Sequence, residues 1–529
     1  MAGGGVVSSS GGGGHDFPGS GKITLRVGLC TIVAALGGFL FGYDLGIAGG
    51  VTSMDEFLMT FFPKVYNRKH HAHEDNYCKF NDFNLQLFTS SLYLAAIVSS
   101  LIVSFFAKKL GRKIFITTAS VFFLIGAILN ASAQNLAMLI IGRLFLGLGL
   151  GCGNQTIPLY ISEIAPAKKR GFLNICFQLL ITVGILIANI VNYFFSGVNH
   201  GWRFCLGGAA IPAFILLVCS FFIVDTPASL VERNKEESGK NTLKKIRAVD
   251  NVDAEFEEIV RATGAANKTK HPYMELVFNR RNWPPLISAI LIHFFQQFTG
   301  INVIMFYAPV LFQTMGLGAN ASLLSALITG GVNCVSTLIS NFTVDRYGRR
   351  KLLILGGLIM FVGQCVVGGI LKVTLKSTNA VSGGIAKFVV VMICLFVCAF
   401  AWSWGPLGWL IASEIFPLET RNAGYFSAVF VNMLCTFIIG QFFLTMLCNW
   451  RSFTFFFFAI FLALMTVFVF FLLPETKGIP IDEITDRAWK PHWFWKRFYS
   501  TSGDGFEKME ANKSDTHKPK QVQLQPLDN

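Results

Sequence analysis

Charged residues are scarce in this sequence. Asp, Glu, Lys and Arg make up only 14% of the 529 residues, whereas soluble globular domains carry about 25%. This scarcity excludes an ordinary soluble globule. Phosphate-binding loops, metal-ligand clusters and nucleophile–base pairs are also lacking, so we predict a protein that is not an enzyme and that has no catalytic site, metal site or cofactor. A cleavable secretory signal is missing as well, because the first apolar run is too long for one.

Apolar residues are abundant instead. They form 53% of the chain, and the mean hydropathy is +0.54. A helix of about 20 apolar residues crosses a hydrocarbon core of about 30 Å. The sequence therefore predicts an all-α membrane protein with twelve transmembrane helices in a lipid bilayer. We expect them at 25–48, 85–107, 114–134, 137–160, 172–196, 204–224, 284–312, 322–343, 352–373, 386–412, 424–447 and 453–473.

The net charge of +14 comes mainly from every second loop. Segments 108–113, 167–171, 225–283 and 346–351 are basic, whereas the loops ASAQN and GLGAN carry no charge. Cytoplasmic loops of membrane proteins carry the excess of Lys and Arg. We therefore expect a multi-pass protein with both termini in the cytoplasm, and we predict no nucleic-acid partner.

Three motifs occur twice, in the same order, at an offset of about 240 to 250 residues. SEIAPAKKR (162–170) matches SEIFPLETR (413–421), LGRK (110–113) matches YGRR (347–350), and Asp225-Thr226 matches Glu475-Thr476. The chain thus reads as six spans written twice. The predicted units are a disordered cytoplasmic head (1–24), a six-helix bundle (25–224) with an outer loop (49–84), cytoplasmic connector helices (225–283), a second bundle (284–473) and a cytoplasmic tail (474–529).

The repeated charged residues predict a cytoplasmic gate. Salt bridges shared between two rigid bundles would hold the cytoplasmic side closed and break when it opens. The alternative is that these residues are only helix caps and topological anchors. The connector is likewise either a solvated spacer or a latch on the motif loops. The predicted gate residues are Arg112, Glu163, Arg170, Asp345, Arg349, Glu414 and Arg421.

Several segments together resemble the sugar porter family of the major facilitator superfamily. They are GRLFLG, PLYISEIAP, QQFTGIN, DRYGRRK and LPETKG, and FGYDLGIAGG and KPHWFWKR extend the likeness to the plant sugar transport proteins. The resemblance implies the major facilitator fold and a plasma-membrane symporter that imports hexoses, such as glucose, together with protons. One departure is Lys108, which stands where the wider superfamily has Asp, whereas Asp345 keeps the acidic residue in the second half.

A sugar site needs amide groups for hydroxyls and an aromatic platform for the ring. The seventh span holds three amides in seven residues, and a break at Thr299-Gly300 would let them converge, as discontinuous helices do at transporter sites. Pro406 should also kink the tenth span. Any one amide could instead join helices structurally. The predicted sugar-binding residues are Gln178, Gln296, Gln297, Asn302, Asn333 and Asn432, with Trp409 as the platform and Phe41 and Leu45 on the apolar side.

Asp44 lies near the outer end of the first span, where an ionised side chain is costly and therefore points to function. At 1.5 Å per residue, Arg143 in the fourth span lies at a similar depth. We predict that the two form a pair and that Asp44 carries the co-transported proton. Two other functions remain as alternatives: a facilitative uniporter, and a sugar sensor that barely transports. Relatives that work as passive facilitators have Asn at the position of Asp44.

Two cysteines lie outside the apolar spans. Cys78 is in the long outer loop, and Cys448 is at the outer end of the eleventh span. An oxidising exterior permits a disulfide between them, which would tie the two halves together. Cys205, at the outer lip of the sixth span, is the competing partner.

Overall fold

A computed structural model gives the architecture of the chain. It describes residues 23–71, 77–166, 169–268, 271–314, 318–374, 383–417, 419–477, 479 and 484–499. Within these ranges the regular structure is helical, and no strand is present. Nearly all of the predicted head and the end of the tail, residues 1–22 and 500–529, lie outside the described residues.

Twelve helices or helix pairs among the described residues are long and apolar enough to cross a membrane, which confirms the predicted number and order. Their ends differ from the predicted limits by a few residues. They are α1 (Leu25–Val51), α4 (Phe83–Leu110), α5 (Arg112–Ala131), α6 (Leu136–Ile164), α7 (Arg170–Phe195), α8 with α9 (Gly201–Gly207 and Ala210–Ser220), α14 with α15 (Trp283–Phe298 and Ile301–Thr314), α16 (Ala319–Tyr347), α17 (Arg349–Thr374), α18 with α19 (Gly383–Trp402 and Trp404–Glu414), α20 (Arg421–Trp450) and α21 (Phe453–Leu472).

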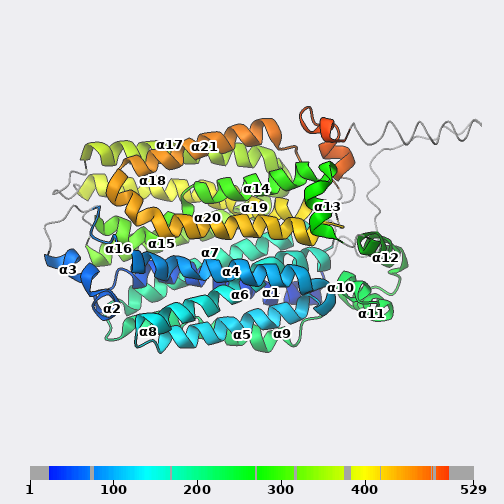
Figure 1. Ribbon diagram of the computed structural model, residues 1–529, viewed down its shortest axis with the longest axis horizontal. Helices are drawn as coiled ribbons and strands as arrows, with labels where there is room; N and C mark the ends of the chain where they lie inside the picture. Colours follow the sequence, from blue (N-terminus) through cyan, green and yellow to red (C-terminus); the bar gives the residue numbers. More distant parts are fainter. Residues whose placement is uncertain are drawn as a thin grey trace, which may run out of the picture.

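Short helices lie at the two ends of the bundle (Figure 1). At one end, which we call the loop side, α2 (Asp55–Phe61) and α3 (Pro63–His71) occupy the predicted outer loop. At the other end, the connector side, are α10 (Pro227–Glu232), α11 (Glu236–Arg247), α12 (Asp253–Lys268) and α13 (Pro272–Phe278). The apolar residues Leu243 and Ile246 of α11 are buried, as expected for an amphipathic surface helix.

The two halves pack in the same way and lie side by side (Figure 1). In the first half α1 packs on α7, α4 on α6 and α5 on α9; in the second half α14 packs on α20, α16 on α18 and α17 on α21. Between the halves, α4 meets α20, α7 meets α16 and α1 meets α15. These contacts follow the internal repeat, so the interface runs through the middle of the molecule.

Two spans of the second half are broken near its centre. In the seventh span, α14 ends at Phe298 and α15 starts at Ile301, and Gly300 between them has φ +85°, a conformation that favours glycine. In the tenth span the helix breaks at Ser403 (φ −124°, ψ −88°). Pro406 lies four residues after Trp402, whose carbonyl it would clash with in a continuous helix. Both predicted breaks are therefore present, and backbone carbonyls at each accept hydrogen bonds from amide side chains of the second half.

Candidate functional site

Asp44 and Arg143 are in direct contact inside the first half. The Asp44 Oδ1 accepts a hydrogen bond from Nη1 of Arg143, and the two side chains are almost fully buried. Arg143 also donates from Nε to the Phe88 carbonyl at 2.9 Å, and its guanidinium lies 4.7 Å from the centre of the Phe88 ring. The arginine is thus held from α4 even without the carboxylate.

The second carboxylate oxygen of Asp44, Oδ2, has no hydrogen-bond partner among the described residues. A buried oxygen without a donor is costly, and a protonated carboxyl reduces that cost because it carries no charge. The pair therefore has one oxygen committed to Arg143 and one that can take a proton.

All nine predicted sugar-binding residues line a single cavity at the interface of the halves. Its volume is about 50 Å³, which is small beside ligand pockets of about 300 to 1,000 Å³. A sugar can therefore enter only when the halves separate on one side. The cavity residues come from α1 (Phe41, Leu45), α7 (Gln178), α14 (Gln296, Gln297), α15 (Asn302), α16 (Asn333), α19 (Trp409) and α20 (Asn432).

The amides of the second half are joined in one network. Gln296 donates from Nε2 to the carbonyls of Trp404 and Gly405, at 2.8 and 3.1 Å, where the tenth span is broken. Its Oε1 accepts from Nδ2 of Asn432 at 2.9 Å. Gly408 lets α19 approach this amide, since a Cβ there would lie 2.6 Å from Nε2. The helix break thus fixes the orientation of Gln296.

Gln178 differs from this network because its amide has no hydrogen-bond partner among the described residues. Asn333 donates only a weak bond to the Met305 sulfur at 3.8 Å, and its Oδ1 is buried without a partner in the described part of the chain. Gln178 belongs to the first half and Asn333 to the second, and both line the cavity, so each half offers an amide group that is available to a ligand.

Trp409 is held by two edge-to-face contacts. Its ring centre lies 5.1 Å from that of His293 and 6.4 Å from that of Phe177. Such contacts fix the ring plane. A rigid aromatic face in the cavity is suited to the apolar face of a sugar ring, whereas Trp404 is packed away and donates to the Leu353 carbonyl.

The ion pair and the cavity lie on neighbouring faces of α1. Phe41 and Leu45 are four residues apart and share the face that lines the cavity. Asp44 is turned by roughly 60 to 100° from them, given about 100° per residue, toward Arg143 on α6. A small shift of one helix therefore changes both sites.

Other cavity residues were not predicted from the sequence. Thr436 donates to Gln297 Oε1 at 2.9 Å and lies one turn after Asn432, a spacing that marks the same helix face. The apolar lining residues carry no such signal, because apolar side chains fill every span of this chain. They are Ile181, Ile185, Ile301, Met305 and Phe400.

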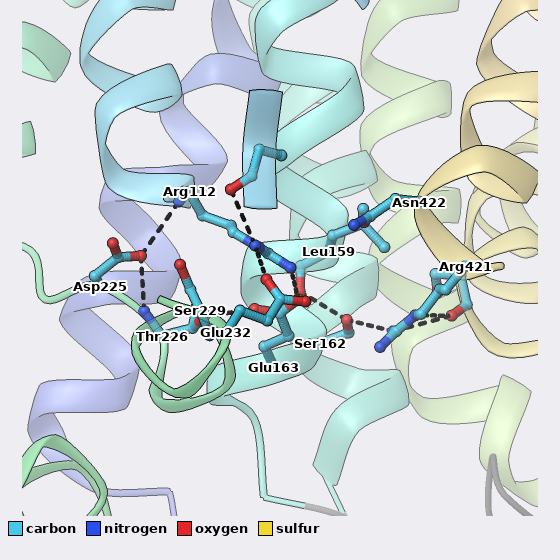
Figure 2. A network of polar contacts seen from close by, with 12 residues as sticks. Arg112, Leu159, Ser162, Glu163, Asp225, Thr226, Ser229, Glu232, Arg421 and Asn422 are labelled. Carbon is cyan, nitrogen blue, oxygen red and sulfur yellow. Dashed lines mark hydrogen bonds and ion pairs between the residues drawn. The ribbon is translucent and has the colours of Figure 1, made fainter. Parts of the chain in front are cut away.

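On the connector side, the first half carries a dense ionic network (Figure 2). Arg112 lies 3.2 Å from Glu163 and 2.5 Å from Glu232 of α10. Asp225 accepts from the backbone N–H of Arg112 at 3.3 Å, at the start of α5, and pairs with Arg233. The connector is therefore fastened to the motif loop.

The second half repeats this arrangement. Glu475 accepts from the backbone N–H groups of Arg349 and Arg350 at 2.9 and 3.0 Å, and Arg349 lies 3.6 Å from Glu414. The repeated sequence pairs thus form repeated contacts, but each lies within one half. The predicted inter-helix salt bridges from the two arginine loops to Glu163 and Glu414 are therefore present. Each of these two bridges joins helices of one half, because each arginine starts the helix next to its glutamate, so these two pairs do not support a network shared between the halves.

Contacts between the halves on this side involve other groups. Arg421 donates to the Ser162 hydroxyl at 2.8 Å (Figure 2), and Asn174 donates to the Ser413 hydroxyl at 2.9 Å. Arg421 and the equivalent Arg170 each bond within their own half as well. Arg170 donates from Nε to the Ser162 carbonyl at 3.1 Å, and Arg421 donates from Nε to the Ser413 carbonyl at 3.2 Å. The side chain of Asp345 lies outside the described residues.

Tyr273 of α13 is a residue that the sequence analysis missed. Its hydroxyl donates to Ser104 of α4 at 2.6 Å, and its ring lies 6.2 Å from that of Phe426 of α20. One connector residue therefore touches both halves, at the place where α4 and α20 meet, which fits a latch better than a spacer.

The loop side is also closed by contacts between the halves. Tyr307, at a non-helical kink in α15, hydrogen bonds with Thr89 of α4 at 2.7 Å, and Ser90 donates to Gln441 of α20 at 2.7 Å. The predicted disulfide between Cys78 and Cys448 is present, with the Cα atoms 4.5 Å apart, whereas Cys205 is a buried free thiol. The cavity is thus closed at both ends.

Replacing Cys78 with Ser should lower the apparent melting temperature of the purified protein by on the order of 5 °C, because the bond joins residues 370 positions apart. Thermal unfolding with and without a reductant checks this. Reduction should destabilise the unaltered protein and leave Cys78→Ser unchanged, and Cys205→Ser serves as the control. Equal melting of Cys78→Ser and the unaltered protein would contradict the prediction.

Known proteins with related sequences and structures are numerous. The model of the family described as "Sugar (and other) transporter" matches residues 30–488. Sugar transport protein 2 of Arabidopsis thaliana is 59% identical over 479 residues, covering 90% of this chain and 96% of the relative. Sugar transport protein MST4 of Oryza sativa subsp. japonica is 55% identical, covering 92% and 95%.

Among solved structures, the proton:xylose symporter XylE of the major facilitator superfamily, bound to 6-bromo-6-deoxy-D-glucose, matches with a TM-score of 0.75. It is 26% identical, and the match covers 87% of this chain and 98% of XylE. These relatives are transporters, not enzymes. The chain therefore belongs to the sugar transporter family of the major facilitator superfamily and is a multi-pass membrane sugar transporter similar to the plant sugar transport proteins.

Proposed function

We propose that this transporter is a proton-coupled importer of monosaccharides, with glucose and related hexoses as substrates. The observation that carries the proposal is the buried Asp44–Arg143 pair on the helix whose next face lines the cavity. A passive carrier has no need of a carboxylate there, and burial of an ion pair costs free energy. The XylE relative is itself a proton symporter.

The cavity chemistry supports a small polyhydroxylated substrate. Amides offer both donors and acceptors to hydroxyl groups, and the described cavity lining contains six amides but no charged side chain. Trp409, which lines the cavity, would stack its ring on the apolar face of the sugar. The available amides Gln178 and Asn333 would bind hydroxyls from opposite halves and so draw the halves together.

In the proposed cycle, Asp44 takes a proton while the cavity faces outside. Loss of its charge weakens the contact with Arg143, which stays bound to the Phe88 carbonyl. The α1 helix then shifts, and Phe41 and Leu45 close on the sugar. The occupied protein opens on the connector side, releases the sugar and returns the proton. The protein needs no cofactor besides the protons that it carries.

The connector side would face the cytoplasm, at the plasma membrane. The basic loops and α10 to α13 lie on that side, and Lys and Arg are concentrated on cytoplasmic loops. The disulfide lies at the opposite end, where an oxidising exterior permits it. Both termini would then be cytoplasmic.

Radiolabelled glucose uptake in yeast without its own hexose transporters tests the function. We expect uptake to concentrate the sugar, to rise as the external pH falls from about 7 to 5, and to collapse with an uncoupler, because a proton enters with each cycle. Uptake that reaches only equilibrium and ignores the uncoupler would identify a facilitative uniporter. Binding without turnover would identify a sensor.

A further inference from the structure

A basic cleft lies on the connector side of the first half, apart from the sugar cavity. Its volume is about 490 Å³, and it is a broad surface depression open to solvent rather than an enclosed pocket. The end of α4 and the segment from the end of α10 form its walls. The lining residues are Lys108, Lys109, Glu232, Arg233 and Lys235.

The charges of this cleft are unbalanced. Its single carboxylate, Glu232, is already paired with Arg112, and Arg233 is paired with Asp225. Lys108, Lys109 and Lys235 have no acidic partner among the described residues, and Lys109 and Lys235 are exposed. Three unpaired ammonium groups around one cleft repel one another, so a multivalent anion is the ligand that relieves the repulsion.

This charge is specific to one half of the internal repeat. Aligning LGRK with YGRR places Lys108 opposite Asp345 and Lys109 opposite Arg346. The corresponding loop of the second half therefore carries an acidic residue where the cleft carries a cation. If the basic residues served only to attract the protein to an anionic membrane surface, both loops would be expected to be equally basic.

Exposed apolar side chains lie on α4 within three residues of Lys108. Phe105, Phe106 and Leu110 of α4 are 55%, 46% and 43% exposed, and they belong to a membrane-spanning helix. Side chains of this kind contact acyl chains. The cleft thus begins where the apolar surface of α4 ends, which is the depth of lipid headgroups.

We propose that the cleft binds a phosphate monoester, carried by the headgroup of an anionic membrane lipid. A monoester carries close to two negative charges and three acceptor oxygens, which match ammonium groups from two sides. The exposed apolar side chains of α4 beside Lys108 and Lys109 favour a lipid over a soluble phosphate. Because Arg233 also pairs with Asp225, which accepts from the Arg112 backbone at the start of α5, occupancy of the cleft is linked to that network.

The test measures binding to the full-length protein purified in detergent. The probes are dioctanoyl phosphatidylinositol 4-phosphate, dioctanoyl phosphatidylserine, which has only a phosphodiester, and inorganic phosphate. The combined change Lys108→Gln, Lys109→Gln and Lys235→Gln should weaken binding of the first probe on the order of a hundredfold. The matched control removes three other charges on this side of the molecule, by Lys244→Gln, Lys245→Gln and Lys351→Gln, and should retain binding.

Each outcome decides a part of the proposal. Unchanged binding by the triple variant, or equally tight binding of phosphatidylserine, overturns it. If inorganic phosphate binds as tightly as the lipid, and only when the three lysines are present, the cleft is a site for soluble phosphate. The claim that a lipid carries the phosphate is then wrong. Lys108→Asp, which copies the second half, should also weaken binding, and unchanged melting temperatures show that the variants fold.

Discussion

Asp44→Asn should abolish concentrative uptake, so that the ratio of internal to external sugar falls to about one. A proton that enters down about 100 mV and one pH unit supplies roughly 2.3 and 1.4 kcal/mol, and an amide cannot carry it. Asn keeps the size of the side chain and an oxygen for Arg143, so the cavity beside Phe41 and Leu45 should persist. Labelled glucose accumulation in transporter-null yeast measures the effect.

Exchange of labelled for unlabelled sugar is the control for this variant, because exchange needs no net proton movement. It should remain within about tenfold of the unaltered protein, provided that equal amounts reach the membrane. Arg143 loses its counter-ion, and breaking a buried pair costs about 3 to 5 kcal/mol, so protein abundance must be measured. Uncoupler-sensitive accumulation by Asp44→Asn would contradict the proton site.

Gln178→Leu should raise the KM for glucose by roughly tenfold to a hundredfold. The leucine would leave a sugar hydroxyl buried without a partner, at a cost of about 1 to 3 kcal/mol. Because the Gln178 amide bonds to no other described residue, the change removes no visible contact of the protein. Initial uptake rates over a range of glucose concentrations give the KM.

A series of deoxyglucoses sharpens this test. The analogue without the hydroxyl that Gln178 binds should bind the unaltered protein more weakly than glucose does. In Gln178→Leu, glucose and this analogue should bind about equally. Asn130→Leu is the matched control, since Asn130 of α5 is a buried amide outside the cavity that has no hydrogen-bond partner among the described residues. If every analogue responds to Gln178→Leu to the same extent, Gln178 does not touch the sugar.

Polar residues made much of the candidate site predictable from sequence. In a chain of apolar spans, a carboxylate, an arginine or a run of amides stands out, and helix rise gives its depth. That sufficed to bring Asp44 to Arg143 and to place Gln296 and Gln297 at one cavity, whereas the choice of Gln178, Asn333 and Asn432 among other amides also used the family resemblance. Breaks at Gly300 and before Pro406 followed from backbone chemistry alone.

Tertiary packing decides the features that sequence left out. The helix α2 forms where a loop was expected, because Phe57 packs between the rings of Phe88 and Trp202 at 5.3 and 5.8 Å. Tyr273 acquires its role only when α13 reaches the seam between α4 and α20. Residue types likewise showed that Arg112 and Glu163 would pair, but not that both belong to one rigid body.

The placement of those ion pairs has a consequence for turnover. Since Arg112–Glu163 and Arg349–Glu414 each lie within a half, rocking the halves leaves them intact. Among the described residues, each swing exchanges hydrogen bonds between the halves: Arg421–Ser162 and Asn174–Ser413 at one end, and Thr89–Tyr307 and Ser90–Gln441 at the other. A neutral bond of this kind is worth about 0.5 to 1.5 kcal/mol, and one with a charged donor about 1.5 to 3 kcal/mol. The outward-open and inward-open conformations should therefore differ little in free energy, so that the binding of a single sugar can shift the equilibrium between them.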